Sequence, residues 1–430
     1  MNGKVQARPA LTLSFFAAGF LALAGGVLTV ALDPAILTGP YYQPKLLALA
    51  HWLVLGWLGS VFLGAAYQLG PVIAESPLRF PLLGWFHLAL HLTGLPCMVY
   101  GFAAGNYHWI LAGGVLVTSG CIAFVITQLA TAQASWRGDP VGCALVIGWF
   151  WLAVTLGLGL FMTGNRLAGL ESAPSQWLRI HAILGTTGFF LTVFNAVSLR
   201  LVPMFAVTTR QSNARTWTSL VQTQAGLLLV APASLLHFSP LLWLSGLLIL
   251  SGQLLFLWEI LAQLARRHRQ LDGPLNWFAG SFLWLPLAMT GLLLLMNRTG
   301  LNLTMLEPEA GAVLVFTVYL LGCLTTAVLA MSFKIIPFLV WQAAYGRHLG
   351  RSRVPPLSSL VHERLFLLAS TGSTLGIIIL VGALSEQSGF LIRTAAIMLG
   401  VGIGCAMTNF ILSGRHLRCP QLQPLNFPTA

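Results

Sequence analysis

Long apolar stretches, separated by short polar segments, run along the whole chain. Twelve of them are each close to the roughly 20 residues that an α-helix needs to cross a bilayer. They cover residues 11–37, 45–71, 81–104, 107–133, 140–165, 176–205, 215–236, 240–263, 275–296, 311–341, 363–383 and 389–414. This pattern predicts an all-α, polytopic membrane protein of about twelve transmembrane helices. No polar stretch is long enough for a soluble domain, so we expect residues 1–430 to form a single transmembrane domain.

The composition agrees with this class and argues against a nucleic-acid partner. Of the 430 residues, 57% are hydrophobic and only 7% are charged, whereas about 25% are charged in a typical soluble domain. The net charge is +12, but the 22 basic residues are spread over short loops, which is typical of topology signals. The apolar run that follows Lys4 and Arg8 is too long for a signal peptide, so we interpret it as the first helix.

The distribution of Lys and Arg also predicts the orientation of the chain. With alternating helices, fourteen of these residues fall in loops on one side of the membrane and four fall in loops on the other. Cytoplasmic loops are enriched in Lys and Arg. We therefore expect an integral protein of a bacterial inner membrane, in contact with the lipid bilayer, with both termini in the cytoplasm.

A threefold repeat emerges when three apolar stretches are aligned on a proline near their ends. The prolines, which are almost evenly spaced along the chain, are Pro71, Pro203 and Pro337. Three residues before each proline stands a long polar or basic side chain: Gln68, Arg200 and Lys334. Fifteen residues before each proline stands a glycine: Gly56, Gly188 and Gly322. The alignment predicts three pseudo-repeated four-helix arcs, at about residues 11–133, 140–263 and 275–414.

Four of the ten histidines lie inside apolar stretches: His51, His87, His91 and His181. A neutral imidazole in hydrocarbon needs partners for its donor and its acceptor, so intramembrane histidines are usually hydrogen-bonded or metal-bound. His51 and His181 each lie roughly 8–9 Å below the outer end of their helices, at 1.5 Å per residue. They stand at nearly equivalent places before their prolines, and Thr317 takes this place in the third stretch. We expect His51 and His181 to bind a cofactor.

His87 and His91 allow two interpretations. They lie four residues apart and therefore share one helix face, and such a pair can bind a metal ion. The same pair can equally be hydrogen-bonded within the bundle, to backbone groups or to Thr93. The sequence leaves open whether this pair shares a site with His51 and His181.

Acidic side chains add few candidates for chemistry. Glu259, near the end of its apolar stretch, is expected to reach Arg266 or Arg267. The apolar stretches contain no pair of carboxylates that would indicate a proton-coupled transporter.

The helix count, the three arcs and the two outer histidines together resemble the heme-copper oxidase subunit I superfamily. The resemblance is carried by HWLVLGWLG, which begins at His51, and by IHAILGTTGFF, which contains His181. In that superfamily a histidine of helix two ligates low-spin heme and a histidine of helix six ligates copper. The architecture covers the whole chain, and it implies heme or copper at His51 and His181.

The chain departs from the oxygen-reducing members of that superfamily in two helices. Those members carry further histidine ligands on helices seven and ten. Here the corresponding stretches, RTWTSLVQTQAGLLLV and VLVFTVYLLGCLTTAVLAMSFK, contain no histidine. Oxygen reduction by the family mechanism is therefore not expected. The chain is more similar to the divergent NnrS-like membrane proteins, which are associated with heme, copper and nitric-oxide stress.

These observations lead to one main hypothesis and two alternatives. The main hypothesis is a membrane protein that binds heme and/or copper through His51 and His181, with His87 and His91 as further metal ligands. Its task would be electron transfer, nitric-oxide handling or metal handling, in contact with a respiratory or redox partner protein. The alternatives are a transporter or channel on the same scaffold, and an accessory subunit without a cofactor.

Overall fold

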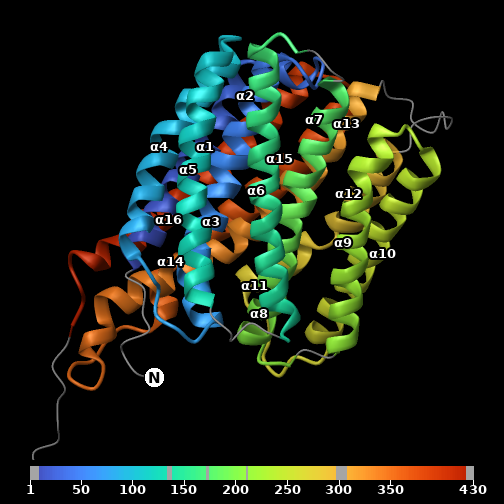
Figure 1. Cartoon of the computed structure of the whole chain (residues 1–430). Coiled ribbons are helices and arrows are strands. Elements are labelled where there is room, and N and C mark those ends of the chain that lie inside the picture. Colours follow the sequence, from blue (N-terminus) through green and yellow to red (C-terminus); the bar gives the residue numbers. More distant parts are fainter. Residues whose placement is uncertain (1–8, 133–137, 171–173, 210–211, 297–307, 423–430) are drawn as a thin grey trace, which may run out of the picture.

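The computed structural model describes residues 9–132, 138–170, 174–209, 212–296 and 308–422. The chain folds into a bundle of long, roughly parallel and antiparallel helices (Figure 1). The longer helices are α1 (Pro9–Leu32), α4 (Pro81–Ala103), α5 (Tyr107–Ala132), α6 (Pro140–Leu167), α9 (Asn213–Leu235), α10 (Ser239–Ala265), α15 (Glu363–Ser385) and α16 (Gly389–Gly414). Between α10 and α13, the shorter helices α11 (Gly273–Ser281) and α12 (Trp284–Met296) follow one another along one path. The predicted all-α class is confirmed.

Three further rods each consist of an α-helix, a π-helical segment of eight residues and a second α-helix. The first is α2 (Pro44–His51), η2 (Trp52–Gly59) and α3 (Ser60–Ile73). The second is α7 (Pro174–Ile183), η4 (Leu184–Leu191) and α8 (Thr192–Ala206). The third is α13 (Pro308–Thr317), η5 (Val318–Thr325) and α14 (Thr326–Tyr345). π-Helices are rare, and they are frequent at functional sites.

The three π segments begin at Trp52, Leu184 and Val318, each at the same distance before the aligned proline of its rod. The segments also meet inside the bundle through side chains. Nε1 of Trp57 donates to Oγ1 of Thr325, 3.0 Å away, and the Tyr319 hydroxyl donates to the carbonyl oxygen of Thr186, 2.8 Å away. η5 is thereby tied to both other segments.

Eleven helical spans in the described part of the chain are long and apolar enough to cross a membrane. The twelfth predicted stretch, residues 215–236, forms α9, which is 23 residues long but more polar than the others. Its hydroxyl side chains Thr216, Ser219 and Thr223 are buried, whereas Val221 and Leu228 are exposed. α9 therefore still presents an apolar face outward and keeps its polar groups inside the bundle.

Leucines that are more than half exposed occur on several helices; examples are Leu21, Leu28, Leu82, Leu228 and Leu287. A soluble protein rarely exposes so much apolar surface, whereas the hydrocarbon core of a bilayer would solvate it. The molecule is an integral membrane protein. α1 packs along α16. The described chain begins and ends at the same end of the bundle, the lower end in Figure 1. We call this the termini end.

Candidate functional site

A large cavity lies in the half of the bundle remote from the termini end. Its volume is about 630 Å³, which is within the range of roughly 300–1,000 Å³ that is usual for cofactor and ligand pockets. Its walls come from all three π-containing rods and are mainly apolar; they include Leu47, Met98, Leu156 and Phe316. The cavity therefore suits a large, mostly apolar ligand.

His51, the last residue of α2, lines this cavity. Its Nδ1 is 2.8 Å from the carbonyl oxygen of Leu47, one turn earlier on the same helix. Because a carbonyl only accepts hydrogen bonds, Nδ1 carries the proton and Nε2 keeps its lone pair. The ring of Phe102 stacks against the imidazole, with centroids 4.4 Å apart and an interplanar angle of 20°. These contacts fix both the tautomer and the orientation of the His51 ring.

His181 on α7 lines the same cavity and lies beside His51. The two imidazole centroids are 6.2 Å apart, with an interplanar angle of 29°. Nδ1 of His181 is buried and has no hydrogen-bond partner in the described part of the chain. The two histidines are far apart in the sequence, so the fold brings together the pair that was predicted to bind a cofactor.

Thr317, the residue that corresponds to these histidines in the third rod, also lines the cavity. The three aligned positions therefore face one space. Other polar residues of the wall were not predicted, because nothing in the local sequence marks them. Arg179 is exposed at the cavity wall, and His237 lines it while Nε2 of His237 is 2.8 Å from Nε2 of Gln176.

His87 and His91 on α4 lie in a separate, tightly packed cluster and do not line the cavity. Nδ1 of His87 is 2.9 Å from the hydroxyl of Tyr67, and Nε2 of His91 is 3.0 Å from Oγ of Ser60. Their own ring centroids are 6.0 Å apart. Thr93, the partner considered from the sequence, bonds instead to backbone carbonyls of α4. The four histidines thus form two pairs rather than one site.

Few further metal-binding side chains lie close to either histidine pair. In the described ranges, no three His, Cys, Asp or Glu side chains gather closely enough to hold one metal ion. A site that uses His51 and His181 would therefore have two ligands of these four residue types.

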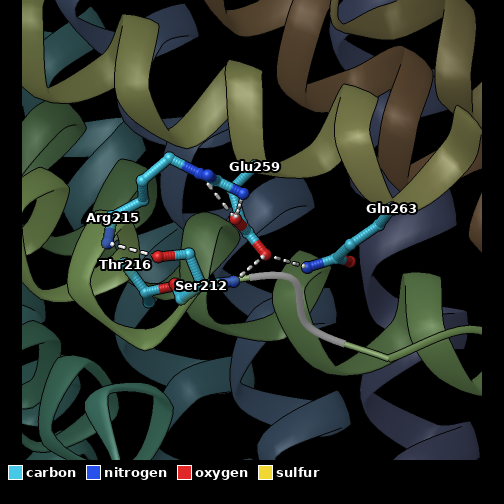
Figure 2. A network of polar contacts seen from close by, with 5 residues as sticks. All are labelled: Ser212, Arg215, Thr216, Glu259 and Gln263. Carbon is cyan, nitrogen blue, oxygen red and sulfur yellow. Dashed lines mark hydrogen bonds and ion pairs between the residues drawn. The ribbon is translucent and has the colours of Figure 1, made fainter. Parts of the chain in front are cut away.

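A second polar cluster lies nearer the termini end, between α9 and α10 (Figure 2). The Glu259 side chain, 1% exposed, accepts from Nη2 and Nε of Arg215 at 2.8 and 3.0 Å. It also accepts from the backbone N–H of Ser212 and from Nε2 of Gln263, both at 3.2 Å. Glu259 thus forms an ion pair with Arg215 on the neighbouring helix α9, a partner that the sequence did not indicate.

Fold and site together define the class of this protein: an all-α integral membrane protein with a mainly apolar cavity that contains two adjacent histidines, His51 and His181. Comparison with protein-family models and with curated proteins found no match to the chain. The function must therefore be argued from the site itself.

Proposed function

We propose that this protein binds heme in the cavity through His51 and His181, as a divergent relative of heme-copper oxidase subunit I. The observation that carries the proposal is the proximity of the two imidazoles, 6.2 Å between centroids, inside a cavity of about 630 Å³. No other pair of histidines in the described part of the chain shares this cavity at such a short ring-to-ring distance.

The residues present fit heme better than a lone copper ion. A porphyrin would supply four nitrogen ligands to its iron, so the histidines His51 and His181 would be enough to hold it. Copper would rely on the two imidazoles together with other ligand types, since no third Cys, Asp or Glu side chain of the described residues joins them. The mainly apolar wall suits the faces of a porphyrin ring, and the Arg179 guanidinium suits its carboxylate groups.

The protein's own contribution is to orient the ligand His51. The hydrogen bond from Nδ1 of His51 to the Leu47 carbonyl orients the ring and increases the basicity of Nε2. Phe102 prevents the ring from turning by stacking on it. When bound, heme would supply an iron that accepts and releases one electron and that can bind a small gas such as nitric oxide.

The repeated geometry of the rods supports the proposed relationship. Three π segments of equal length recur in register with the aligned prolines, and each rod brings its aligned residue to the same cavity. We infer that the bundle is built from three related arcs. The excess of Lys and Arg at the termini end supports a cytoplasmic location of that end, and the cavity would then lie toward the outer face of a bacterial inner membrane. Electron transfer or nitric-oxide handling with a redox partner protein is the task that suits this location.

The proposal is tested by a reduced-minus-oxidised optical spectrum and metal analysis of the detergent-purified protein. We expect Soret and α bands at near-stoichiometric heme. His51→Ala and His181→Ala should each lose most of the heme, because each removes one of the two histidines that would hold it. His91→Ala, in the separate cluster, should retain it.

Two controls make the result interpretable. His348→Ala changes an exposed segment at the termini end and should leave the spectrum unchanged. Thermal unfolding of each variant separates loss of heme from loss of the fold. A wild-type protein without iron or copper and without a spectrum would overturn the proposal, and flux measurements in proteoliposomes would then test a transporter.

A further inference from the structure

The polar residues of α9 belong to a hydrogen-bonded network that runs through the second group of helices, α6 to α10. At mid-depth, Gln224 accepts from Nε1 of Trp151 at 2.6 Å and donates to Oγ1 of Thr192 at 3.1 Å. Beside this group, Gln253 on α10 donates to Oγ1 of Thr223 at 3.0 Å and accepts from Nδ2 of Asn195 at 2.9 Å. Four helices are thus joined by amides and hydroxyls.

This network surrounds a small chamber. Its volume is about 20 Å³, and half of its lining residues are polar: Thr192, Asn195, Thr216, Ser219, Thr223 and Gln224. A cavity needs at least about 10–15 Å³ to hold one water molecule. The chamber is therefore large enough for a single water and too small for an organic ligand.

The side-chain atom at the chamber that lacks a hydrogen bond is an acceptor. Oδ1 of Asn195 is buried and has no partner in the described part of the chain. Thr216 and Ser219 already donate their hydroxyl protons to the backbone carbonyls of Ser212 and Gly252. A buried carbonyl oxygen without a partner loses the free energy of a hydrogen bond, and water is the ligand that can donate one.

A metal cation fits this chamber less well than water does. A monovalent or divalent cation requires several oxygen lone pairs and, in hydrocarbon, a compensating negative charge. Around the chamber, the Gln224 and Gln253 oxygens already accept from Trp151 and Asn195. Among the described residues, no carboxylate lines it.

The polar groups continue from the chamber to the cluster in Figure 2. Thr216, which lines the chamber, bonds to the Ser212 carbonyl oxygen at 3.0 Å, and the Ser212 N–H bonds to Glu259. Gln263, which also donates to Glu259, keeps a buried Oε1 without a partner among the described residues. Unsatisfied acceptors therefore occur at both ends of one polar column.

We propose that this column is an internal hydration site of the membrane domain, in which one water molecule occupies the chamber and donates a hydrogen bond to Oδ1 of Asn195. Four polar side chains of α9 line this chamber: Thr216, Ser219, Thr223 and Gln224. The proposal does not depend on a cofactor in the histidine-lined cavity.

X-ray hydroxyl-radical footprinting of the purified full-length protein tests the site, because radiolysis of a bound water oxidises the side chains beside it. Phe256 lines the chamber and is only 2% exposed. Phe333 is equally buried but packs against Phe366 and Phe410. We expect Phe256 to be oxidised clearly faster than Phe333.

Two variants remove the water in different ways. Asn195→Leu removes the acceptor, and Ala144→Val fills the chamber while leaving every hydrogen-bonding side chain in place. Both should abolish the oxidation of Phe256. Asn165→Leu, the same change on α6 near the opposite end of the bundle, should leave it unchanged. Equal oxidation of Phe256 and Phe333 in the wild type, oxidation that survives in either folded chamber variant, or its loss in Asn165→Leu would each overturn the proposal.

Discussion

At the scale of single residues, two glycines of α6 have opposite surroundings although they are only two positions apart. A Cβ atom at Gly159 would lie 3.2 Å from Cε1 of His181, whereas a Cβ at Gly157 would meet nothing within 4 Å. Gly159 therefore leaves just enough room for the ring of His181. Nothing in the sequence distinguishes the two positions.

This difference predicts different effects of the same substitution. Gly157→Ala should stabilise the protein by about 0.5–1 kcal/mol, because alanine loses less backbone entropy in a helix. In Gly159→Ala the same gain is offset by the contact with His181, and the displaced ring should lower the heme-to-protein ratio. Thermal unfolding and heme content of the two variants check this. Equal stabilisation with full heme content in both would contradict the assigned role of Gly159.

At the scale of the helical elements, two of the π segments, η4 and η5, place a glycine against a tryptophan. A Cβ atom at Gly188 would lie 2.9 Å from the Trp151 ring, and a Cβ at Gly322 would lie 2.8 Å from the Trp284 ring. Trp151 lies on α6, the helix before the second rod, and Trp284 lies on α12, the helix before the third rod. The two glycines thus allow η4 and η5 to pack directly on an aromatic face.

We expect Gly322→Ala to destabilise the protein by about 1–3 kcal/mol, the usual cost of overpacking a well-filled core. Gly404→Ala on α16 is the matched control, since its Cβ would meet nothing within 4 Å. The control should be neutral or slightly stabilising. Unfolding midpoints in one detergent decide between these outcomes, and equal midpoints would show that Trp284 moves aside at little cost.

The pairing of α9 with α10 depends on a buried charge. Breaking a buried ion pair by removing one partner costs about 3 kcal/mol or more, so Glu259→Gln should markedly lower the unfolding midpoint. The exposed pair of Asp33 and Lys45, at 2.9 Å, provides the comparison. Asp33→Asn should cost about 0–1 kcal/mol. If both substitutions had the same small effect, the cluster in Figure 2 would not stabilise the helix pair.

At the scale of the whole molecule, orientation in the membrane can be tested with a native thiol. Cys419 is the only exposed cysteine of the six, and it lies at the termini end. If that end is cytoplasmic, a membrane-impermeant maleimide should label intact cells weakly and permeabilised cells strongly. Cys419→Ser should remove this labelling. Strong labelling of intact cells would reverse the predicted orientation.

Several properties of this protein followed from the sequence alone. The apolar stretches determined the all-α membrane class, because a bilayer selects for helix length and apolarity, which are local properties of the chain. The proline alignment located the rods that carry the π segments, since each segment begins at the same distance before its aligned proline. The sequence also singled out His51 and His181, because an imidazole in hydrocarbon is conspicuous. Their role as heme ligands stays a proposal.

Only the tertiary structure decided which residues meet. It placed His51 beside His181 and gave His87 and His91 the partners Tyr67 and Ser60. It paired Glu259 with Arg215 of the neighbouring helix. It also turned the polar residues of α9 inward, where they line a chamber. The physical reason is the same in each case: a helix's sequence gives its length and its polar face, but the packing of other helices determines what that face touches.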